Sequence, residues 1–60
     1  MPPTRKISIR LTERQYEALE LLVENGEYTS VSEAIRAAIN EFIERKKEKI
    51  AEYARLREMM

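Results

Sequence analysis

The sequence contains no Cys, no His, no Asp and no Trp, and it has only one Gly. Without Cys no disulfide can stabilise the chain, and without His or Cys a zinc or haem site lacks its usual ligands. The same absences remove the parts of hydrolytic triads, thiol nucleophiles and imidazole acid-base catalysis. We therefore expect no enzyme, no bound metal and no cofactor.

The chain is also short, with 60 residues. A domain of this size buries too little apolar surface to offset its conformational entropy comfortably, so self-association is the ordinary remedy. No apolar run approaches the length of a membrane span, and the start at Met1-Pro2-Pro3 lacks the apolar core of a signal peptide. We expect a soluble, cytoplasmic protein that does not engage a membrane.

The charges balance over the whole chain but are distributed unevenly. Residues 1–14 carry +3, because four cationic side chains stand against one Glu, whereas residues 15–33 carry −5, with five Glu and no Lys or Arg. Residues 34–60 carry +2, with seven cations and five Glu. Phosphate attraction acts over roughly a Debye length of about 10 Å at 0.1 M salt, so a locally basic N-terminal segment can bind nucleic acid despite zero net charge.

Residues 6–11 alternate polar and apolar side chains with a period of two, which predicts a β-strand with two unlike faces. One face is apolar and is expected to lie on a core, and it consists of Ile7, Ile9 and Leu11. The other face is polar and consists of Lys6, Ser8 and Arg10.

Two helices are predicted after this strand. Thr12 followed by Gln15 has the spacing of a capping box, and Gly26, the only glycine, predicts the end of the first helix. Ser30 followed by Glu33 predicts a second capping box. The apolar faces of the two helices consist of Tyr16, Leu19, Leu22 and Val23, and of Val31, Ile35, Ala38, Ile39 and Phe42.

Residues 44–60 read as a charged neck followed by an amphipathic tail. Neither Gly nor Pro occurs after Gly26, so we expect the second helix to run on through the neck. The tail carries a further apolar stripe of Ile50, Tyr53, Leu56 and Met60.

A single strand leaves its backbone amide and carbonyl groups unpaired, and no second strand is predicted in this chain. We therefore expect the strand to pair with its copy from a second chain, in a two-fold symmetric homodimer. The pair would present two copies of its polar face on an antiparallel ribbon that fits the major groove of DNA. The predicted fold class is mostly α with one short strand per chain.

The order of these elements resembles the ribbon-helix-helix repressors, a group that includes Arc, MetJ and CopG. The resemblance spans about residues 5–43 and rests on the strand, on Thr12, on the turn Gly26-Glu27-Tyr28 and on the stretch from Ser30 to Arg36. It implies a sequence-specific transcriptional regulator, a repressor by occupancy of a promoter. Residues 1–4 would then be a flexible arm, residues 5–43 the DNA-binding and dimerisation domain, and residues 44–60 a helical extension.

The resemblance also implies roles for individual residues. The outward strand residues Lys6, Ser8 and Arg10 would contact bases, and the phosphate contacts would come from Arg5, Ser30, Val31 and Ser32. The dimer core would consist of Ile7, Ile9, Leu11, Leu19, Val23, Ile35, Ile39 and Phe42.

Other interpretations remain open for several of these features. The polar strand face can be merely solvated, and Ser30 and Ser32 can serve only to cap a helix. The tail resembles the toxin-binding extension of ParD-like antitoxins, with autoregulation of the operon as the accessory role, but it can equally be a helix that packs on its own dimer. The exposed Leu21 can mark a contact between dimers lined up on DNA. A purely structural helical dimer that binds no DNA is a further alternative.

Overall fold

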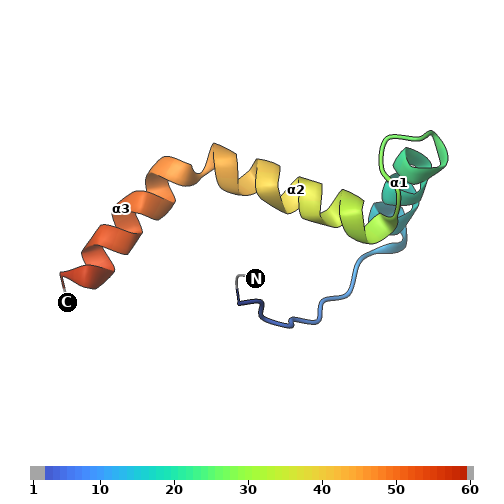
Figure 1. The fold of residues 1–60 in the computed structure, drawn as a ribbon. Coiled ribbons are helices and arrows are strands. Elements are labelled where there is room, and N and C mark those ends of the chain that lie inside the picture. The colour runs from blue at the N-terminus through green and yellow to red at the C-terminus, as the bar shows by residue number, and fades with distance from the viewer. Residues whose placement is uncertain (1–2, 60) are drawn as a thin grey trace.

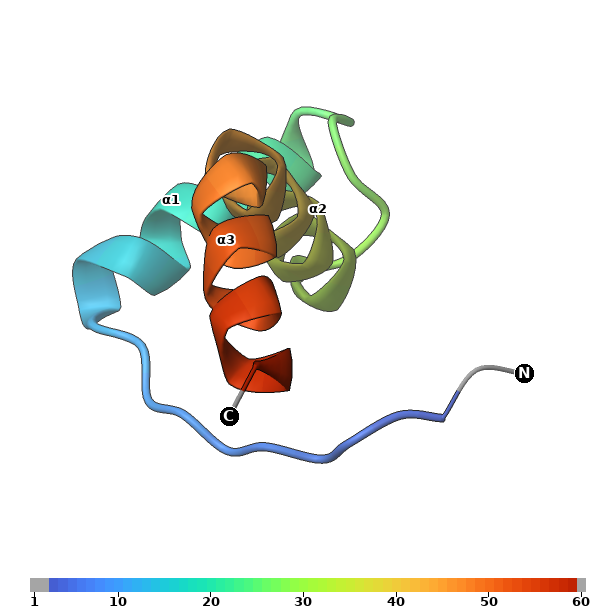
Figure 2. The same ribbon diagram turned by 90° about the vertical axis from the view of Figure 1, so that its left-hand side faces the viewer.

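The computed structural model describes residues 3–59, which form an extended N-terminal segment followed by three helices (Figure 1). Helix α1 spans Glu13–Glu24, α2 spans Val31–Arg45 and α3 spans Lys47–Glu58. Helix α1 lies at one end of α2 and α3 lies at the other. Seen almost along α2, the N-terminal segment passes beneath the helices, on the side toward which α3 bends (Figure 2).

Helix α1 begins and ends as the sequence predicts. The backbone N–H of Thr12 donates to Gln15 Oε1 at 2.9 Å, and the N–H of Gln15 donates to Thr12 Oγ1 at 3.1 Å, which completes the capping box. At the other end, Gly26 has a φ of 80°. Its N–H donates to the Val23 carbonyl at 3.0 Å and the N–H of Glu27 donates to the Leu22 carbonyl at 2.9 Å. These two bonds form the Schellman arrangement that closes a helix.

The second predicted capping box forms only by half. Ser30 is the N-cap of α2, and its hydroxyl accepts from the N–H of Glu33 at 3.2 Å. The carboxylate of Glu33 pairs instead with the Arg36 guanidinium at 2.8 Å. A cation one helical turn away therefore competes for the side chain that the box requires.

The prediction of a β-strand was wrong for this chain. Within residues 3–59 the structure contains helices and no strand, and residues 3–12 belong to no regular element. A strand exists through hydrogen bonds to a neighbouring strand, and every other element of the chain is a helix whose backbone groups are already paired. The predicted two-stranded ribbon is accordingly absent, and the described fold class is all α with an extended N-terminal segment.

The helix predicted to continue through the charged neck is interrupted. Helix α2 ends at Arg45, Lys46 has a φ of −103° and a ψ of 7°, and α3 starts at Lys47. The interruption falls in the charged neck, where Arg45 and Lys49 are like charges four residues apart, a spacing at which they would destabilise a continuous helix.

The chain has almost no core of its own. Ala34, with 2% of its surface exposed, is the single buried residue among the described ones, and it lies in α2. The radius of gyration is 15.2 Å, whereas about 10.4 Å is typical of a compact domain of this length. No helix in the described part of the chain has both the length and the apolar character needed to cross a membrane.

Candidate nucleic-acid interface

The N-terminal segment exposes the side chains predicted to contact DNA bases. Lys6, Ser8 and Arg10 are all solvent-exposed, and so is Arg5, which was predicted to contact a phosphate. Successive side chains of an extended backbone point to opposite sides, so these three alternate with the apolar Ile7, Ile9 and Leu11. The segment therefore presents a polar edge and an apolar edge, as the sequence pattern indicates.

The remaining predicted phosphate contacts lie at the amino end of α2. Ser30 and Ser32 are exposed and Val31 is half-buried. Ser30 serves as the N-cap, so its capping role is present in the structure. The first amides of a helix have no acceptor within the helix, and together with the helix dipole they favour an anion. Capping and phosphate binding are therefore compatible at this end of α2.

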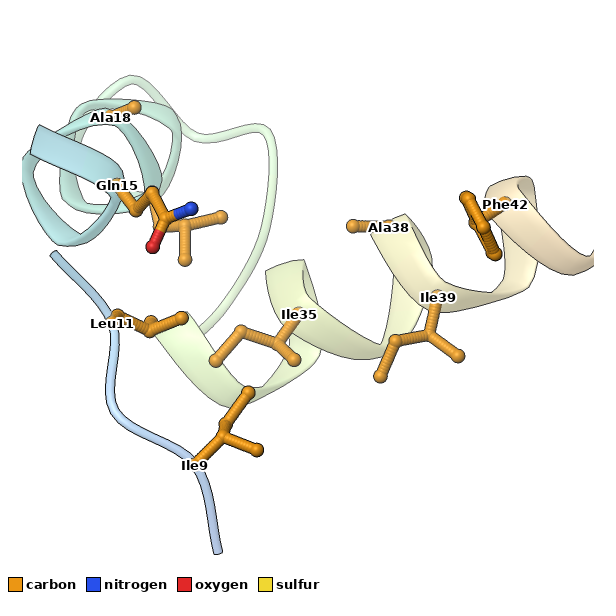
Figure 3. Close-up of a pocket in the computed structure, with 9 residues that line it drawn as sticks. Ile9, Leu11, Gln15, Ala18, Ile35, Ala38, Ile39 and Phe42 are labelled. Carbon is orange, nitrogen blue, oxygen red and sulfur yellow. The ribbon is translucent and has the colours of Figure 1, made fainter.

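An apolar groove lies between the N-terminal segment, α1 and α2 (Figure 3). Its volume is about 440 Å³. We call it the apolar groove, and its lining consists of Ile9, Leu11, Gln15, Ala18, Leu19, Ile35, Ala38, Ile39 and Phe42. Figure 3 shows Ile9 and Leu11 of the segment on one side and the isoleucines of α2 beside them.

The groove brings together six of the eight residues predicted for the dimer core, since only Ile7 and Val23 do not line it. Ile7 is 71% exposed and Val23 is half-buried. The core prediction omitted Gln15, Ala18 and Ala38, which also line the groove. Gln15 is four residues from Leu19, so helical periodicity could have indicated it, and Ala38 belongs to the apolar face that the sequence predicts for the second helix. Ala18 is next to Leu19 and has no such spacing to a predicted core residue.

The groove is open to solvent. Phe42 is 58% exposed and Ile39 is 47% exposed, although both have large apolar side chains. Exposed apolar side chains that lie next to one another can form a contact surface for another macromolecule. The groove is therefore a candidate surface for such a contact.

The predicted partner-binding tail is also exposed. Ile50 and Tyr53 share a shallow hollow of α3 with Ala54 and Arg57, and Leu56 is 50% exposed. Met60, the fourth residue of the predicted stripe, lies outside the described residues.

Comparison with known proteins gives a family and two relatives. Residues 5–46 match the model of the family described as "Ribbon-helix-helix protein, copG family". Over 56 residues the chain is 61% identical to an "Uncharacterized protein" of Archaeoglobus fulgidus, with 93% of each chain covered. Over 39 residues it is 38% identical to "Transcriptional regulator CdrS" of Halobacterium salinarum, covering 65% of this chain and 71% of that protein. No solved structure gives a significant match.

Proposed function

Because the chain belongs to the copG family of ribbon-helix-helix proteins, we propose that it is a DNA-binding transcriptional regulator that acts as a homodimer and represses by occupying a promoter. One observation carries the proposal most directly. The basic N-terminal segment lies with its polar side chains in solvent and with Ile9 and Leu11 on the apolar groove. The polar side chains that would contact DNA thus belong to the same segment as the apolar side chains that a second copy would cover.

The exposed area supports a dimer. The chain exposes 6326 Å², whereas a compact protein of 7.1 kDa exposes about 4,100 Å². The excess of about 2,200 Å² is of the order that one partner buries in an extensive, obligate interface. Packing of a second copy on the N-terminal segment and on the exposed apolar side chains of the helices would bury much of it.

The chemistry of the segment suits base recognition. Arg10 can donate two hydrogen bonds to O6 and N7 of a guanine. The ammonium group of Lys6 can donate to the same atoms but lacks the forked geometry of the guanidinium. Ser8 can donate or accept and therefore discriminates less between bases. We assign base contacts to these three residues and expect Arg10 to contribute most.

The phosphate contacts would position the protein without selecting a sequence. Arg5 supplies a cation next to the base-contacting side chains. The amides of Val31 and Ser32 and the hydroxyls of Ser30 and Ser32 supply neutral donors at the start of α2. Such contacts set the register of the protein on the duplex.

The test begins with selection of a preferred operator from random oligonucleotides by the purified protein. A Lys6→Ala/Arg10→Ala double variant is then compared with the parent by gel shift on that operator. Each lost base contact is expected to cost roughly 1–3 kcal/mol. A Lys47→Ala/Arg55→Ala double variant removes the same charge from α3 and serves as the control, with affinity close to that of the parent. If the first variant stays dimeric and binds the operator as tightly as the parent, base contact by this segment is wrong.

Two related questions have separate tests. Repression is tested by placing the selected operator across a promoter and measuring transcription with and without the protein. If neither the operator nor any nonspecific duplex is bound with a salt-dependent affinity, the structural dimer without DNA is favoured instead.

Toxin neutralisation stays a prediction, supported only by the exposed apolar residues of α3. A toxin gene next to the gene of this protein would favour it, and so would loss of toxin capture after deletion of residues 48–60.

A further inference from the structure

Helix α3 presents a face on which cationic side chains outnumber the anionic one, Glu58. The face is centred on Ile50, Tyr53, Ala54 and Arg57, which share one hollow. Helical periodicity places Lys49 at one edge and Lys47 and Glu58 at the other, and it places Glu48 and Glu52 on the opposite side of the helix. Ile50 is 46% exposed and Tyr53 is 66% exposed. We call this surface the α3 face.

Helix α1 presents the opposite combination. Glu17, Glu20 and Glu24 surround Leu21 in a second shallow hollow. Leu21 is 58% exposed, and the side of α1 on which it lies is turned away from the side that lines the apolar groove. We call this surface the α1 outer face. It offers an apolar centre with an acidic rim, whereas the α3 face offers an apolar centre with a basic rim.

These two faces cannot meet within one chain. Helix α2 has 15 residues, so its rise of about 1.5 Å per residue separates its two ends by roughly 22 Å. Helix α1 lies at the start of α2 and α3 leaves from its far end (Figure 1). The two ion pairs within the described residues are Arg36–Glu33 in α2 and Lys47–Glu44 across the break between α2 and α3. Each joins residues three positions apart, and neither involves Glu17, Glu20, Glu24, Lys49 or Arg57.

We propose that the α3 face of one copy packs on the α1 outer face of a second copy, with Ile50 and Tyr53 against Leu21. The cations Lys49 and Arg57 then lie beside the carboxylates of the acidic rim. The contact rests on the homodimer of the proposed function but uses neither the apolar groove nor the N-terminal segment. In a two-fold dimer it forms twice, because each chain supplies one face of each kind.

Charge complementarity is what selects a second copy as the occupant. DNA would meet the cations of the α3 face but would leave its apolar centre exposed, and it would be repelled by the α1 outer face. A second copy covers the apolar centres of the α3 face and of the α1 outer face, and it places the basic rim of one against the acidic rim of the other. Residues 15–33 hold five Glu and no cation, so the acidic surface is distributed along α1 and the turn that follows it.

Disulfide trapping tests the contact directly, since the chain contains no Cys. Purified Leu21→Cys and Tyr53→Cys variants are mixed, allowed to exchange subunits and oxidised mildly. We expect a covalent product containing one chain of each variant. The matched control replaces Tyr53→Cys by Ala51→Cys, which lies on the other side of α3, and it should give little of this product. Equal yields from the two mixtures, or no mixed product, would overturn the proposal.

A charge-reversal cycle gives an independent readout. Glu20→Lys/Glu24→Lys should raise the dimer dissociation constant by about 4- to 700-fold, as expected for loss of four exposed ion pairs, two in each of the two contacts. Adding Lys49→Glu/Arg57→Glu in the same chain should restore most of the parental value. Absence of restoration would overturn the contact.

The same measurements separate this proposal from the proposed function. A dimer that binds its operator but shows neither the mixed product nor the restoration refutes the α1–α3 contact and leaves the proposed function intact. A monomeric protein at all concentrations refutes both. If Lys49→Glu/Arg57→Glu weakens operator binding but leaves the dimer dissociation constant unchanged, the α3 face binds DNA and the proposal is overturned.

Discussion

Gly26 shows how a single residue closes α1. Its φ of 80° lies in the left-handed region, and a Cβ placed there would meet nothing within 4 Å. A substitution at this position would therefore strain the backbone without producing a clash. Gly26 is also the only glycine of the sequence, which is why its role could be predicted before the structure was known.

We predict that Gly26→Ala lowers the free energy of unfolding by about 1 kcal/mol, the usual cost of a left-handed conformation for a residue with a Cβ. Gly26→Asn should cost less, because asparagine adopts this conformation more readily. Urea unfolding of the three proteins at one fixed concentration measures the difference. Equal losses for Ala and Asn would show that the cost does not arise from the sign of φ.

At the scale of the elements, the two helix starts differ although their sequences look alike. Both have a hydroxyl residue followed three positions later by Gln or Glu. Only Thr12 and Gln15 exchange both hydrogen bonds, because Glu33 pairs with Arg36. The spacing of a capping box therefore predicts the start of a helix reliably, whereas the second bond of the box depends on which other partners the side chain can reach.

We predict that Thr12→Ala lowers the free energy of unfolding by about 1 kcal/mol, since the N–H of Gln15 loses its acceptor at the exposed start of α1. Thr12→Ser keeps a hydroxyl at this position and serves as the control, with nearly the parental stability. Thermal unfolding followed by far-ultraviolet circular dichroism measures both. A loss in Thr12→Ser as large as that in Thr12→Ala would point to the threonine methyl group instead of the cap.

At the scale of the whole molecule, the dominant feature is apolar surface that the single chain leaves exposed. Helix α2 contributes Ile39 and Phe42 to it, and both line the apolar groove. Stability that depends on a second copy depends on protein concentration, since only the assembled state buries this surface.

We predict that the melting temperature rises by several degrees when the protein concentration is raised 100-fold, as mass action requires for an obligate dimer. Phe42→Glu places a charge in the apolar groove and should shift the protein to a monomeric, largely unfolded state at micromolar concentration. Glu41→Gln is the control, because Glu41 is the neighbouring residue of α2 and does not line the groove, so this variant should leave the assembly unchanged. Sedimentation equilibrium and calorimetry measure both effects. A melting temperature independent of concentration in the parent protein would contradict the prediction.

DNA binding is a property of the whole assembly as well, and its salt dependence reports the number of phosphates contacted. We predict that Arg5→Ala weakens binding to all duplexes to a similar degree and flattens the plot of log affinity against log salt concentration. Loss of one phosphate contact per chain should change the slope by about 2 for a dimer. Titration at several salt concentrations tests this, with Arg55→Ala as the control. An unchanged slope would remove Arg5 from the phosphate contacts.

Much of the site could be predicted because its signals are local. The alternation over residues 6–11 predicted an apolar edge of three residues, of which Ile9 and Leu11 line the apolar groove and Ile7 does not. Six of the eight residues predicted for the dimer core line it. The strand itself could not be derived from this alternation, because strand formation needs a second backbone with unpaired groups. The helix break at Lys46 was missed for a different reason, since neither Gly nor Pro marks it.

The sequence alone determined the family, the two capped helices, the glycine that ends α1 and the basic character of the N-terminal segment. All of these depend on residues within a few positions of one another, so local hydrogen bonding and periodicity suffice to specify them. Only the tertiary structure decided that the segment is not a strand in the single chain, that α3 leaves α2 at Lys46, and that the apolar side chains gather in an open groove instead of a core. These features depend on how separate elements meet in space, and the energy of that packing is not encoded in any one stretch of the chain.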